Sequence, residues 1–404
     1  MSGDEGRPLV VVGVAGGIAA FKACALVRAF TESGHDVRVV PTESALRFVG
    51  AATWEALTGH PVATDVWHDA HEVPHVRLGQ RADLLVVAPA TANTLARAAH
   101  GLADDLLTNT LLTVRCPVVV APAMHTEMWE HPATVANVRT LRERGVLVLD
   151  PARGRLTGAD SGPGRLPEPE EIFAVARAAL DRGRVTHDLA GTRVLVTAGG
   201  TREALDPVRF LGNRSSGRQG YAFAQTAWAR GADVVLVTAS TGLPDPAGAT
   251  VVRVESTEEM RDAVQRHVRD VDAVVMAAAP ADFRPVEVAT SKIKKTDDDP
   301  AAVRLTRTPD ILAELGAHRP AGLRVLVGFA AETDDAVANG RKKLARKRCD
   351  LLVVNEVGGG RGFESADNAA VVLGADGSET EIEESAKTAL ADRVWDLVVE
   401  RLTG

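Results

Sequence analysis

The fold is decided by residues 8–42, PLVVVGVAGGIAAFKACALVRAFTESGHDVRVVPT. The apolar run before the glycine turn predicts a buried strand, the segment after the turn predicts a helix, and the second apolar run predicts another buried strand. DLLVVAPAT (83–91) and CPVVVAPAM (116–124) each predict a strand that ends in Ala-Pro-Ala, and ANTLARAAHGLADDLLTNTLL between them is expected to be helical. Parallel strands bring the loops that follow them to one edge of a sheet, where ligands bind in such folds.

The same pattern restarts at residue 190 with AGTRVLVTAGGTR and SGRQGYAFAQTAWARGADVVLVTA. Further strands are expected at 273–281, 324–332 and 350–357, followed by a covering helix in DRVWDLVVERL. The sequence therefore predicts an α/β protein with two Rossmann-like domains. Because the helix EPEEIFAVARAALDRG ends at residue 183, we place the domains at 1–183 and 190–404, with a linker at 184–189.

Composition narrows the class of protein. A chain of 404 residues is longer than one hydrophobic core usually serves, and its net charge of −8 argues against nonspecific binding to nucleic acid or to an anionic membrane. The three cysteines, Cys24, Cys116 and Cys349, form no zinc motif. The acidic start MSGDEGRP does not resemble a signal peptide, and no apolar run approaches the ~20 residues that span a bilayer. We therefore expect a cytoplasmic protein without a structural metal.

Each half begins with a glycine loop before a helix, an arrangement that favours an anion at the helix N-terminus. Neither loop has GxGxxG in order, since GVAGG and TAGGT are spaced differently. This spacing disfavours a plain NAD-dependent dehydrogenase.

Several motifs occur in one order over nearly the whole chain. They are AGGIAAFK, HVRL, PATANTLARAAHGLADDLL, PAMHTEMW, TAGGTREALDPVRFLGNRSSGRQG, AAAPADFRP, KIKK, GFAAET and FESADN. Together they closely resemble the bifunctional coenzyme A biosynthesis family, in which phosphopantothenoylcysteine decarboxylase is fused to phosphopantothenate–cysteine ligase. The resemblance implies an N-terminal flavodoxin-like flavoprotein domain and a C-terminal nucleotide-binding ligase domain.

The resemblance implies that the second half joins 4'-phosphopantothenate to cysteine through an acyl-cytidylate, using CTP with Mg²⁺. Lys292 in KIKK matches the family's catalytic lysine, which would stabilise charge at the transferring phosphorus. Alone, this basic run would be interpreted as a solvated loop. Asn213 and Arg209 match residues that hold the acyl end and the phosphate of the substrate, although GNRSSG without this context is typical of a turn.

The CTP site is likewise carried over from the family. Its residues here are Ala277, Ala278, Asp282, Lys292, Pro309, Asp310, Ile311, Phe329, Lys343 and Lys347. The family has Asn where this chain has Thr308. The i, i+4 spacing of Lys343 and Lys347 places both on one helix face, although basic residues near a helix C-terminus also complement its dipole. Mg²⁺ is implied by the triphosphate alone, and no metal ligand is assigned.

For the first half the resemblance implies FMN-dependent decarboxylation of phosphopantothenoylcysteine to 4'-phosphopantetheine. The thiol carbon is oxidised, carbon dioxide leaves to give an enethiol, and the enethiol is reduced, so no net redox occurs. His75 in HVRL matches the catalytic histidine, although one of eleven histidines chosen blind would more often have a surface or capping role. The flavin contacts carried over are Gly16, Gly17, Thr42, Ser44, Ala90 and Asn93.

The substrate of this half is expected to contact His125, Met128 and Arg165. His125 replaces the family's usual Asn, which holds the substrate carboxylate. A histidine also donates to a carboxylate, but the substitution could equally weaken the site. Many relatives carry serine at position 17, so one hydroxyl contact is missing here.

Residues 154–165, GRLTGADSGPGR, match a flap that closes over the substrate in many relatives. The flap keeps its glycines and Arg165, but Thr157, Gly158 and Ala159 stand where those relatives have Ala-Cys-Gly, whose cysteine protonates the enethiol. Three outcomes stay open: another donor such as Asp160, Ser161 or a water replaces the cysteine, this half is slow, or it stops at an intermediate. Two alternative functions follow, an active ligase with an impaired flavoprotein half and a regulatory flavin-binding module.

The expected partners are the small-molecule substrates 4'-phosphopantothenate, cysteine and CTP, with neither nucleic acid nor membrane. The resemblance also implies a homo-oligomer, a dodecamer built from trimers of the decarboxylase half and dimers of the ligase half.

Overall fold

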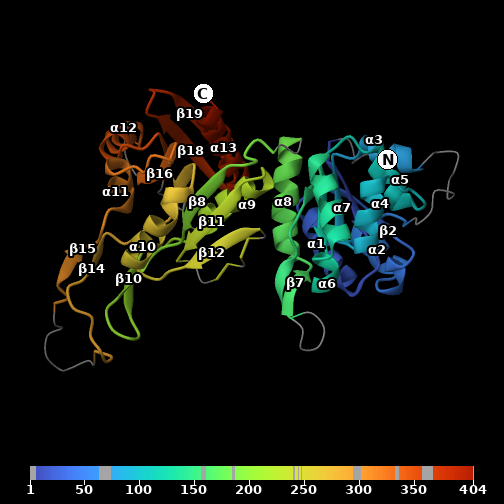
Figure 1. The fold of residues 1–404 in the computed structure, drawn as a ribbon, viewed down its shortest axis with the longest axis horizontal. Helices are drawn as coiled ribbons and strands as arrows, with labels where there is room; N and C mark the ends of the chain where they lie inside the picture. The colour runs from blue at the N-terminus through green and yellow to red at the C-terminus, as the bar shows by residue number, and fades with distance from the viewer. Residues whose placement is uncertain are drawn as a thin grey trace. The chain divides into compact units, whose positions relative to one another are not determined.

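The chain forms two compact units, Met1–His187 and Asp188–Gly404 (Figure 1). The computed structural model describes residues 6–62, 74–155, 161–183, 187–239, 242–243, 245–246, 248–293, 302–332, 336–356 and 367–403. Leu189 is fully buried in the second unit, and Asp188 forms an ion pair there with Arg230, 2.7 Å apart. In the described residues no helix has the length and apolar character needed to cross a membrane.

The first unit contains a five-stranded parallel sheet in the order β2-β1-β3-β4-β5. Its strands are β1 (Leu9–Val14), β2 (Asp36–Pro41), β3 (Leu84–Ala90), β4 (Val118–Pro122) and β5 (Leu147–Val148). This is the flavodoxin-like order, in which the direction of winding reverses between β1 and β3 and opens a ligand crevice at the strands' carboxyl ends.

Helices cover this sheet. The main helices are α1 (Ala23–Glu32), α2 (Ala51–Thr58), α3 (Pro74–Arg81), α4 (Ala92–His100), α5 (Leu106–Thr113), α6 (Thr126–Trp129), α7 (Pro132–Glu143) and α8 (Pro169–Arg182). Leu95, Leu107 and Leu141 bring α4, α5 and α7 onto the buried residues of one sheet face. Phe30 of α1 packs edge-to-face on Phe173 of α8, with ring centroids 4.8 Å apart. Short 3₁₀ helices η1 (Ile18–Lys22) and η2 (Ala45–Arg47) follow β1 and β2, and β6 (Ala152–Arg155) pairs with β7 (Ser161–Arg165).

The single helical segment expected at 92–112 was wrong, because the structure divides it into α4 and α5. Gly101 ends α4 in the left-handed conformation at φ 68°, which glycine adopts without strain. Asp105 then starts α5 with a capping box shared with Thr108.

The second unit contains an eight-stranded sheet in the order β12-β11-β8-β13-β16-β17-β18-β19. Its strands are β8 (Arg193–Ala198), β11 (Asp233–Thr238), β12 (Ala249–Arg253), β13 (Ala273–Met276), β16 (Val325–Glu332), β17 (Leu351–Glu356), β18 (Asp367–Gly374) and β19 (Glu379–Ala386). The strands from β12 to β17 pair in parallel, whereas β18 pairs antiparallel with both β17 and β19. This is the Rossmann order with an antiparallel extension, and its winding reverses between β8 and β13. The prediction of two Rossmann-like domains is therefore confirmed.

Both faces of this sheet are covered, because successive strand residues are buried on opposite sides. Val194 and Val196 of β8 face α9 (Arg218–Ala229) and α13 (Lys387–Thr403), whereas Leu195 faces the other cluster. That cluster contains α10 (Thr257–His267), α11 (Ile311–Ala317) and α12 (Ala336–Lys347). The remaining elements are β9 (Arg202–Ala204), β10 (Phe210–Gly212), β14 (Phe283–Pro285), β15 (Leu305–Arg307) and η4 (Val268–Asp270).

The strand expected at 273–281 is shorter, since β13 ends at Met276. Beyond it, the N–H of Ala278 donates to the Thr197 hydroxyl at 3.1 Å and the N–H of Ala279 donates to the Gly199 carbonyl at 2.9 Å. The backbone therefore leaves the regular ladder here and follows the carboxyl edge of the sheet.

Candidate functional sites

The loops that follow β1, β2, β3 and β4 meet at one edge of the first unit. The Ala15 N–H donates to the Pro89 carbonyl at 3.0 Å, and the Thr42 N–H donates to the Val14 carbonyl at 2.9 Å. The Ala123 N–H donates to the Ala90 carbonyl, also at 3.0 Å. The structure therefore brings the predicted flavin residues of several loops to one edge.

Gly16 and Gly17 differ in the space around them. A Cβ at Gly16 would lie 2.2 Å from Oγ and 2.8 Å from the carbonyl carbon of Ser44, so the β1 and β2 loops approach closely only with glycine here. At Gly17 the nearest atom to such a Cβ is Cγ2 of Thr91, at 3.9 Å. Position 17 therefore has room for a Cβ, which would be in ordinary van der Waals contact with Thr91.

The other flavin positions lie beside these glycines or at the start of α4. The hydroxyls of Thr42 and Ser44 lie 3.1 Å apart. Ala90 is fully buried at the end of β3, and Thr91 caps α4 by accepting from the Thr94 N–H. Asn93 is exposed, and its Oδ1 accepts from Nε of Arg97 at 3.3 Å.

The described base of the flap is joined to the loop that carries His125. The Met124 N–H donates to the Gly164 carbonyl at 3.0 Å, and the Thr126 hydroxyl donates to the Pro163 carbonyl at 2.8 Å. His125 and Met128 flank these bonds with exposed side chains. Thr157, Gly158, Ala159 and Asp160 lie outside the described residues, as does the side chain of Ser161.

A charged bridge connects the flap base to the flavin edge. Glu168, at the start of α8, accepts from Nζ of Lys22 at 2.8 Å and from Nη2 of Arg165 at 3.2 Å. Lys22 ends η1, the helix that follows Gly17. The sequence reasoning missed Lys22 and Glu168, because residues 146 positions apart give no local signal of their pairing.

His75 lies in the first turn of α3, which packs against α5. Its carbonyl accepts from the Thr113 hydroxyl at 2.8 Å, and its Nδ1 is enclosed without a hydrogen-bond partner in the described structure. In the described residues no hydrogen bond joins His75 to Gly16, Ser44 or His125. Its catalytic contact with the substrate stays a prediction.

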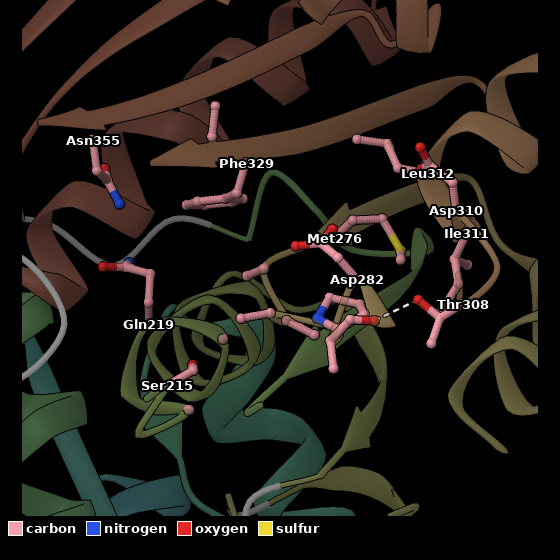
Figure 2. Close-up of a pocket in the computed structure, with 18 of the residues that line it drawn as sticks. Ser215, Gln219, Met276, Asp282, Thr308, Asp310, Ile311, Leu312, Phe329 and Asn355 are labelled. Atoms are coloured by element: carbon pink, nitrogen blue, oxygen red, sulfur yellow. Dashed lines mark hydrogen bonds between the residues drawn. The ribbon is translucent and has the colours of Figure 1, made fainter. Parts of the chain in front are cut away.

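The second unit contains a cavity of about 590 Å³ at the carboxyl edge of its sheet (Figure 2), within the range of small-molecule sites. Its lining combines the start of α9, the loop after β13, the segment before α11, and side chains of β16, α12 and β17. The lining residues are 215–220, 276–283, 307–312, Phe329, Ala330, Lys343, Lys347, Asn355, Asn368 and Lys387. Every residue predicted to bind the nucleotide except Lys292 is among them.

The loop 277–283 forms one wall of the cavity, and side chains brace its backbone. Nδ2 of Asn213 donates to the Ala279 and Pro280 carbonyls at 3.2 and 3.0 Å. The Thr308 hydroxyl donates to the Ala281 carbonyl at 2.5 Å, the bond drawn in Figure 2. Thr308, where the family pattern has Asn, therefore supports the wall through its hydroxyl.

The start of α9 supplies a second wall. Gly217 caps this 12-residue helix with φ 81°, and the N-terminal residues from Ser215 to Gly220 line the cavity. Peptide dipoles at such an end favour an anion. The SSGRQG turn contains this signal, although the sequence analysis assigned only Arg209 and Asn213, which precede it.

Three amide side chains at the cavity were missed. Gln219 donates to the Lys387 carbonyl at 3.1 Å and accepts from Nδ2 of Asn368 at 3.2 Å. Oδ1 of Asn355 is enclosed with no partner in the described structure. Asn355 and Asn368 come from neighbouring strands β17 and β18, so only the sheet topology brings them together.

An ion pair joins α12 to the segment before α11. Nζ of Lys347, whose residue is 7% exposed, contacts Oδ2 of Asp310. Burial alone would raise the pKa of Asp310, but the hydrogen bond and charge of Lys347 bring it below its ordinary value. One predicted phosphate-binding cation therefore already has an anionic partner.

Asp206 and Arg209 hold the chain beside Lys292. Oδ2 of Asp206 accepts from Nη2 of Arg209 at 2.6 Å and from the Ile293 N–H at 3.2 Å, while Arg209 also donates to the Ile293 carbonyl at 3.0 Å. The Arg209 hydrogen bonds hold the pKa of Asp206 far below its usual range, against the opposing effect of burial. Lys292 is exposed and does not line the cavity.

A search of the described residues finds no group of three or more His, Cys, Asp or Glu side chains that could hold a metal ion. Two carboxylates nevertheless line the cavity of the second unit, Asp282 and Asp310. Carboxylate and phosphate oxygens are the donors that Mg²⁺ prefers.

Comparisons with known proteins cover both units. Residues 2–180 match the family described as Flavoprotein, and residues 189–402 match the DNA/pantothenate metabolism flavoprotein C-terminal domain. The chain is 60% identical to the Coenzyme A biosynthesis bifunctional protein CoaBC of Mycobacterium tuberculosis, over 98% of this chain and 97% of that one. It is 42% identical to the Bacillus subtilis protein of the same name, over 92% of each. A solved structure, the C-terminal domain of a CoaBC, is 36% identical over 54% of this chain and 99% of its own, with a TM-score of 0.47.

Proposed function

The chain belongs to the family of bifunctional coenzyme A biosynthesis proteins, and from this membership we infer the two reactions that it carries out. It is an enzyme of coenzyme A biosynthesis with ligase and flavin-dependent decarboxylase activities. In detail, we propose that it joins 4'-phosphopantothenate to cysteine with CTP and then decarboxylates the product to 4'-phosphopantetheine with FMN. The observation that supports the ligase step most directly is that the cavity gathers the predicted CTP residues other than Lys292.

We assign the decarboxylase to residues 1–183 and the ligase to residues 190–404. Each assignment places a reaction at the edge where the strand order of one sheet reverses, and ligands bind at this position in open α/β sheets.

In the ligase half, the triphosphate of CTP would lie against the start of α9, whose N–H groups and dipole favour an anion. Lys343 adds positive charge from α12, where Lys347 is already paired with Asp310. Asp282 would hold Mg²⁺ together with the phosphates, because Asp310 is already paired with Lys347. Asn213 braces the wall that the acyl group would meet.

Lys292 has the role of stabilising charge on the transferring phosphorus. Because it is exposed and stands outside the cavity lining, it must approach the nucleotide as the substrates bind. Asp206 and Arg209 hold the adjacent Ile293 while this happens.

In the decarboxylase half, the close approach at Gly16 and the room for a Cβ at Gly17 fit a phosphate-bearing flavin against the β1 loop. When bound, FMN supplies the oxidation and reduction that carbon dioxide loss requires. His75 would take up a proton near the substrate, and His125 would donate to its carboxylate. Glu168 would keep Arg165 at the base of the flap while the substrate is enclosed.

The homo-oligomer that we propose, a dodecamer of trimeric decarboxylase and dimeric ligase halves, is supported by exposed apolar side chains on both units. In the first unit Ile18, Phe21 and Phe48 are 75%, 59% and 50% exposed beside the flavin edge. In the second unit Phe210 and Phe283 are each 50% exposed on the β9–β10 and β14–β15 hairpins. Such groups are typical of association surfaces. Light scattering that finds a monomer would contradict this assembly.

The decisive experiment incubates the purified protein with phosphopantothenate, cysteine, CTP and Mg²⁺ and follows the products by mass spectrometry. Phosphopantetheine, CMP and pyrophosphate are the expected products. Accumulated phosphopantothenoylcysteine would leave only the ligase, whereas an enethiol would place the defect at the proton-donating flap. Unconsumed CTP would contradict the ligase assignment.

A further inference from the structure

Behind the wall formed by residues 277–283 lies a group of buried polar side chains that the proposed reactions do not use. Thr201 and Thr257 are fully buried and Glu203 is 4% exposed. Thr201 follows β8, Glu203 lies on β9, and Thr257 begins α10. A carboxylate as deeply buried as that of Glu203 destabilises the fold unless hydrogen bonds compensate for the lost hydration.

The hydrogen bonds form one chain that ends at the wall. The Thr257 hydroxyl lies 2.8 Å from Oε1 of Glu203, the Thr201 hydroxyl lies 2.9 Å from the Thr257 hydroxyl, and the Ala281 N–H lies 2.8 Å from the Thr201 hydroxyl. Oε1 of Glu203 also accepts from the Thr257 N–H at 2.8 Å, which joins the carboxylate to the start of α10.

The chemistry of the end groups determines the direction of every bond. An ionised carboxylate only accepts, so the Thr257 hydroxyl must donate its one hydrogen to Glu203. Thr257 then has only lone pairs to offer Thr201, so Thr201 donates to it and accepts from Ala281. At the other end of this hydrogen-bond chain the Ala281 N–H can only donate, so both ends require the same direction for every hydrogen bond. Such a chain is polarised in one sense, and its bonds strengthen one another.

The wall lies beyond the end of β13, so loop hydrogen bonds hold its shape. Thr197, Gly199 and Asn213 bind residues 278–280, and they do not reach Ala281. Ala281 is held on one side by Thr201 and on the other by Thr308, which binds its carbonyl. Asp282, the next residue, lines the cavity, and its carbonyl accepts from the Thr308 N–H at 3.1 Å. A shift of Ala281 would therefore move Asp282.

We propose that Glu203, Thr257 and Thr201 form a positioning chain that sets Ala281, and through it Asp282, for the nucleotide. The inference rests on the proposed function, since the nucleotide is CTP only if the cavity belongs to the ligase. These three are positioning residues, because none of them lines the cavity.

The test replaces Thr201 by Val, which keeps the shape and removes the hydroxyl. The Ala281 N–H then lacks its partner, and we expect the dissociation constant for CTP with Mg²⁺, measured by calorimetry on the full chain, to rise by between about fivefold and a hundredfold. Thr201→Ser keeps the hydroxyl and should return the constant to within about twofold of the wild type. This rescue separates positioning from a general loss of packing.

Thr226→Val is the matched control. Thr226 is 2% exposed on α9, does not line the cavity and bonds only within its helix, donating to the Ala222 carbonyl at 2.8 Å. It should lower the melting temperature as Thr201→Val does and leave CTP affinity unchanged. Thr257→Val interrupts the same chain one bond further back, so the double variant with Thr201→Val should bind CTP no worse than Thr201→Val alone.

If Thr201→Val binds CTP as well as Thr226→Val at equal loss of melting temperature, the positioning chain is overturned. The same follows if the effects of Thr201→Val and Thr257→Val on affinity simply add. A wild-type protein that does not bind CTP would overturn the proposed ligase function itself, and the inference with it.

Discussion

Replacing Gly16 by Ala should weaken flavin binding by the first unit. The added Cβ would lie 2.2 Å from Oγ, 2.5 Å from Cβ and 2.8 Å from the carbonyl carbon of Ser44. Rotation of the Ser44 side chain relieves the first contact but not the last, because the carbonyl carbon belongs to the backbone. The β2 loop must therefore move away from β1. Overpacking of this kind costs about 1–3 kcal/mol. If this strain must be overcome when FMN binds, the affinity for FMN falls by about five- to 150-fold.

The assay is a fluorescence titration of FMN with the full-length protein, together with the flavin content of the protein as purified. Gly17→Ser is the matched control, because the neighbouring position is open to 3.9 Å and the substitution adds a hydroxyl. It should bind FMN at least as tightly as the wild type. If Gly16→Ala retains wild-type affinity, the loops do not form the flavin site in the way that we infer.

Three further predictions concern the second unit. Gly220→Ala should lower the melting temperature and weaken CTP binding, because the added Cβ would lie 2.6 Å from a carbonyl oxygen of β8. This overlap outweighs the gain of about 1 kcal/mol in helix propensity. The control Gly322→Ala should change neither quantity, because its Cβ would lie 3.6 Å from the nearest atom. Lys292→Gln should lower kcat for CTP consumption by about a hundredfold or more, because it removes a charge that stabilises the transition state. CTP binding measured by calorimetry should change little. A large loss of CTP affinity with unchanged kcat would contradict the role assigned to Lys292. Arg209 lowers the pKa of Asp206 in the folded protein. The ionised Asp206 therefore contributes its full stabilisation above the ordinary aspartate pKa of about 3.9, and this contribution is lost as the pH falls toward the lower pKa of the folded state. The difference in melting temperature between wild type and Asp206→Asn should be constant from about pH 5 to 8 and shrink below about pH 4.

Much of the fold could be predicted because apolar runs and glycine turns are local signals. The runs at 83–91 and 116–124 became β3 and β4, and the terminal segment became α13. The break between α4 and α5 was missed although Gly101 and Asp105 carry end signals, because an apolar pattern continued across both helices. The early end of β13 had no such signal. There the backbone binds Thr197 and Thr201, and only the folded sheet brings those hydroxyls within reach.

Site residues could be predicted where they belong to a family motif. They could not be predicted where only the folding of distant strands brings them to the site. Asp282, Phe329 and Lys347 belong to motifs, and all three line the cavity. Asn355 lies in the strand expected at 350–357, but no motif near it marks its side chain as part of the cavity. Glu203 stood inside a quoted motif without an assigned role, since its partner Thr257 lies 54 residues further along the chain.

Departures from the family pattern have different consequences in the two halves. In the ligase half, Thr308 braces the wall through its hydroxyl, so the change from Asn preserves a structural contact. In the decarboxylase half, Gly17 leaves room for a Cβ, so the position itself does not require glycine. His125 and the flap residues Thr157, Gly158 and Ala159 are different in kind, because the family's side chains there contact the substrate or supply a proton. Unless another donor such as Asp160, Ser161 or a water replaces the family's cysteine, no packing change can supply the proton. Any loss of activity should therefore affect the decarboxylation and spare the ligation, and it should accumulate an enethiol if the defect lies at the flap.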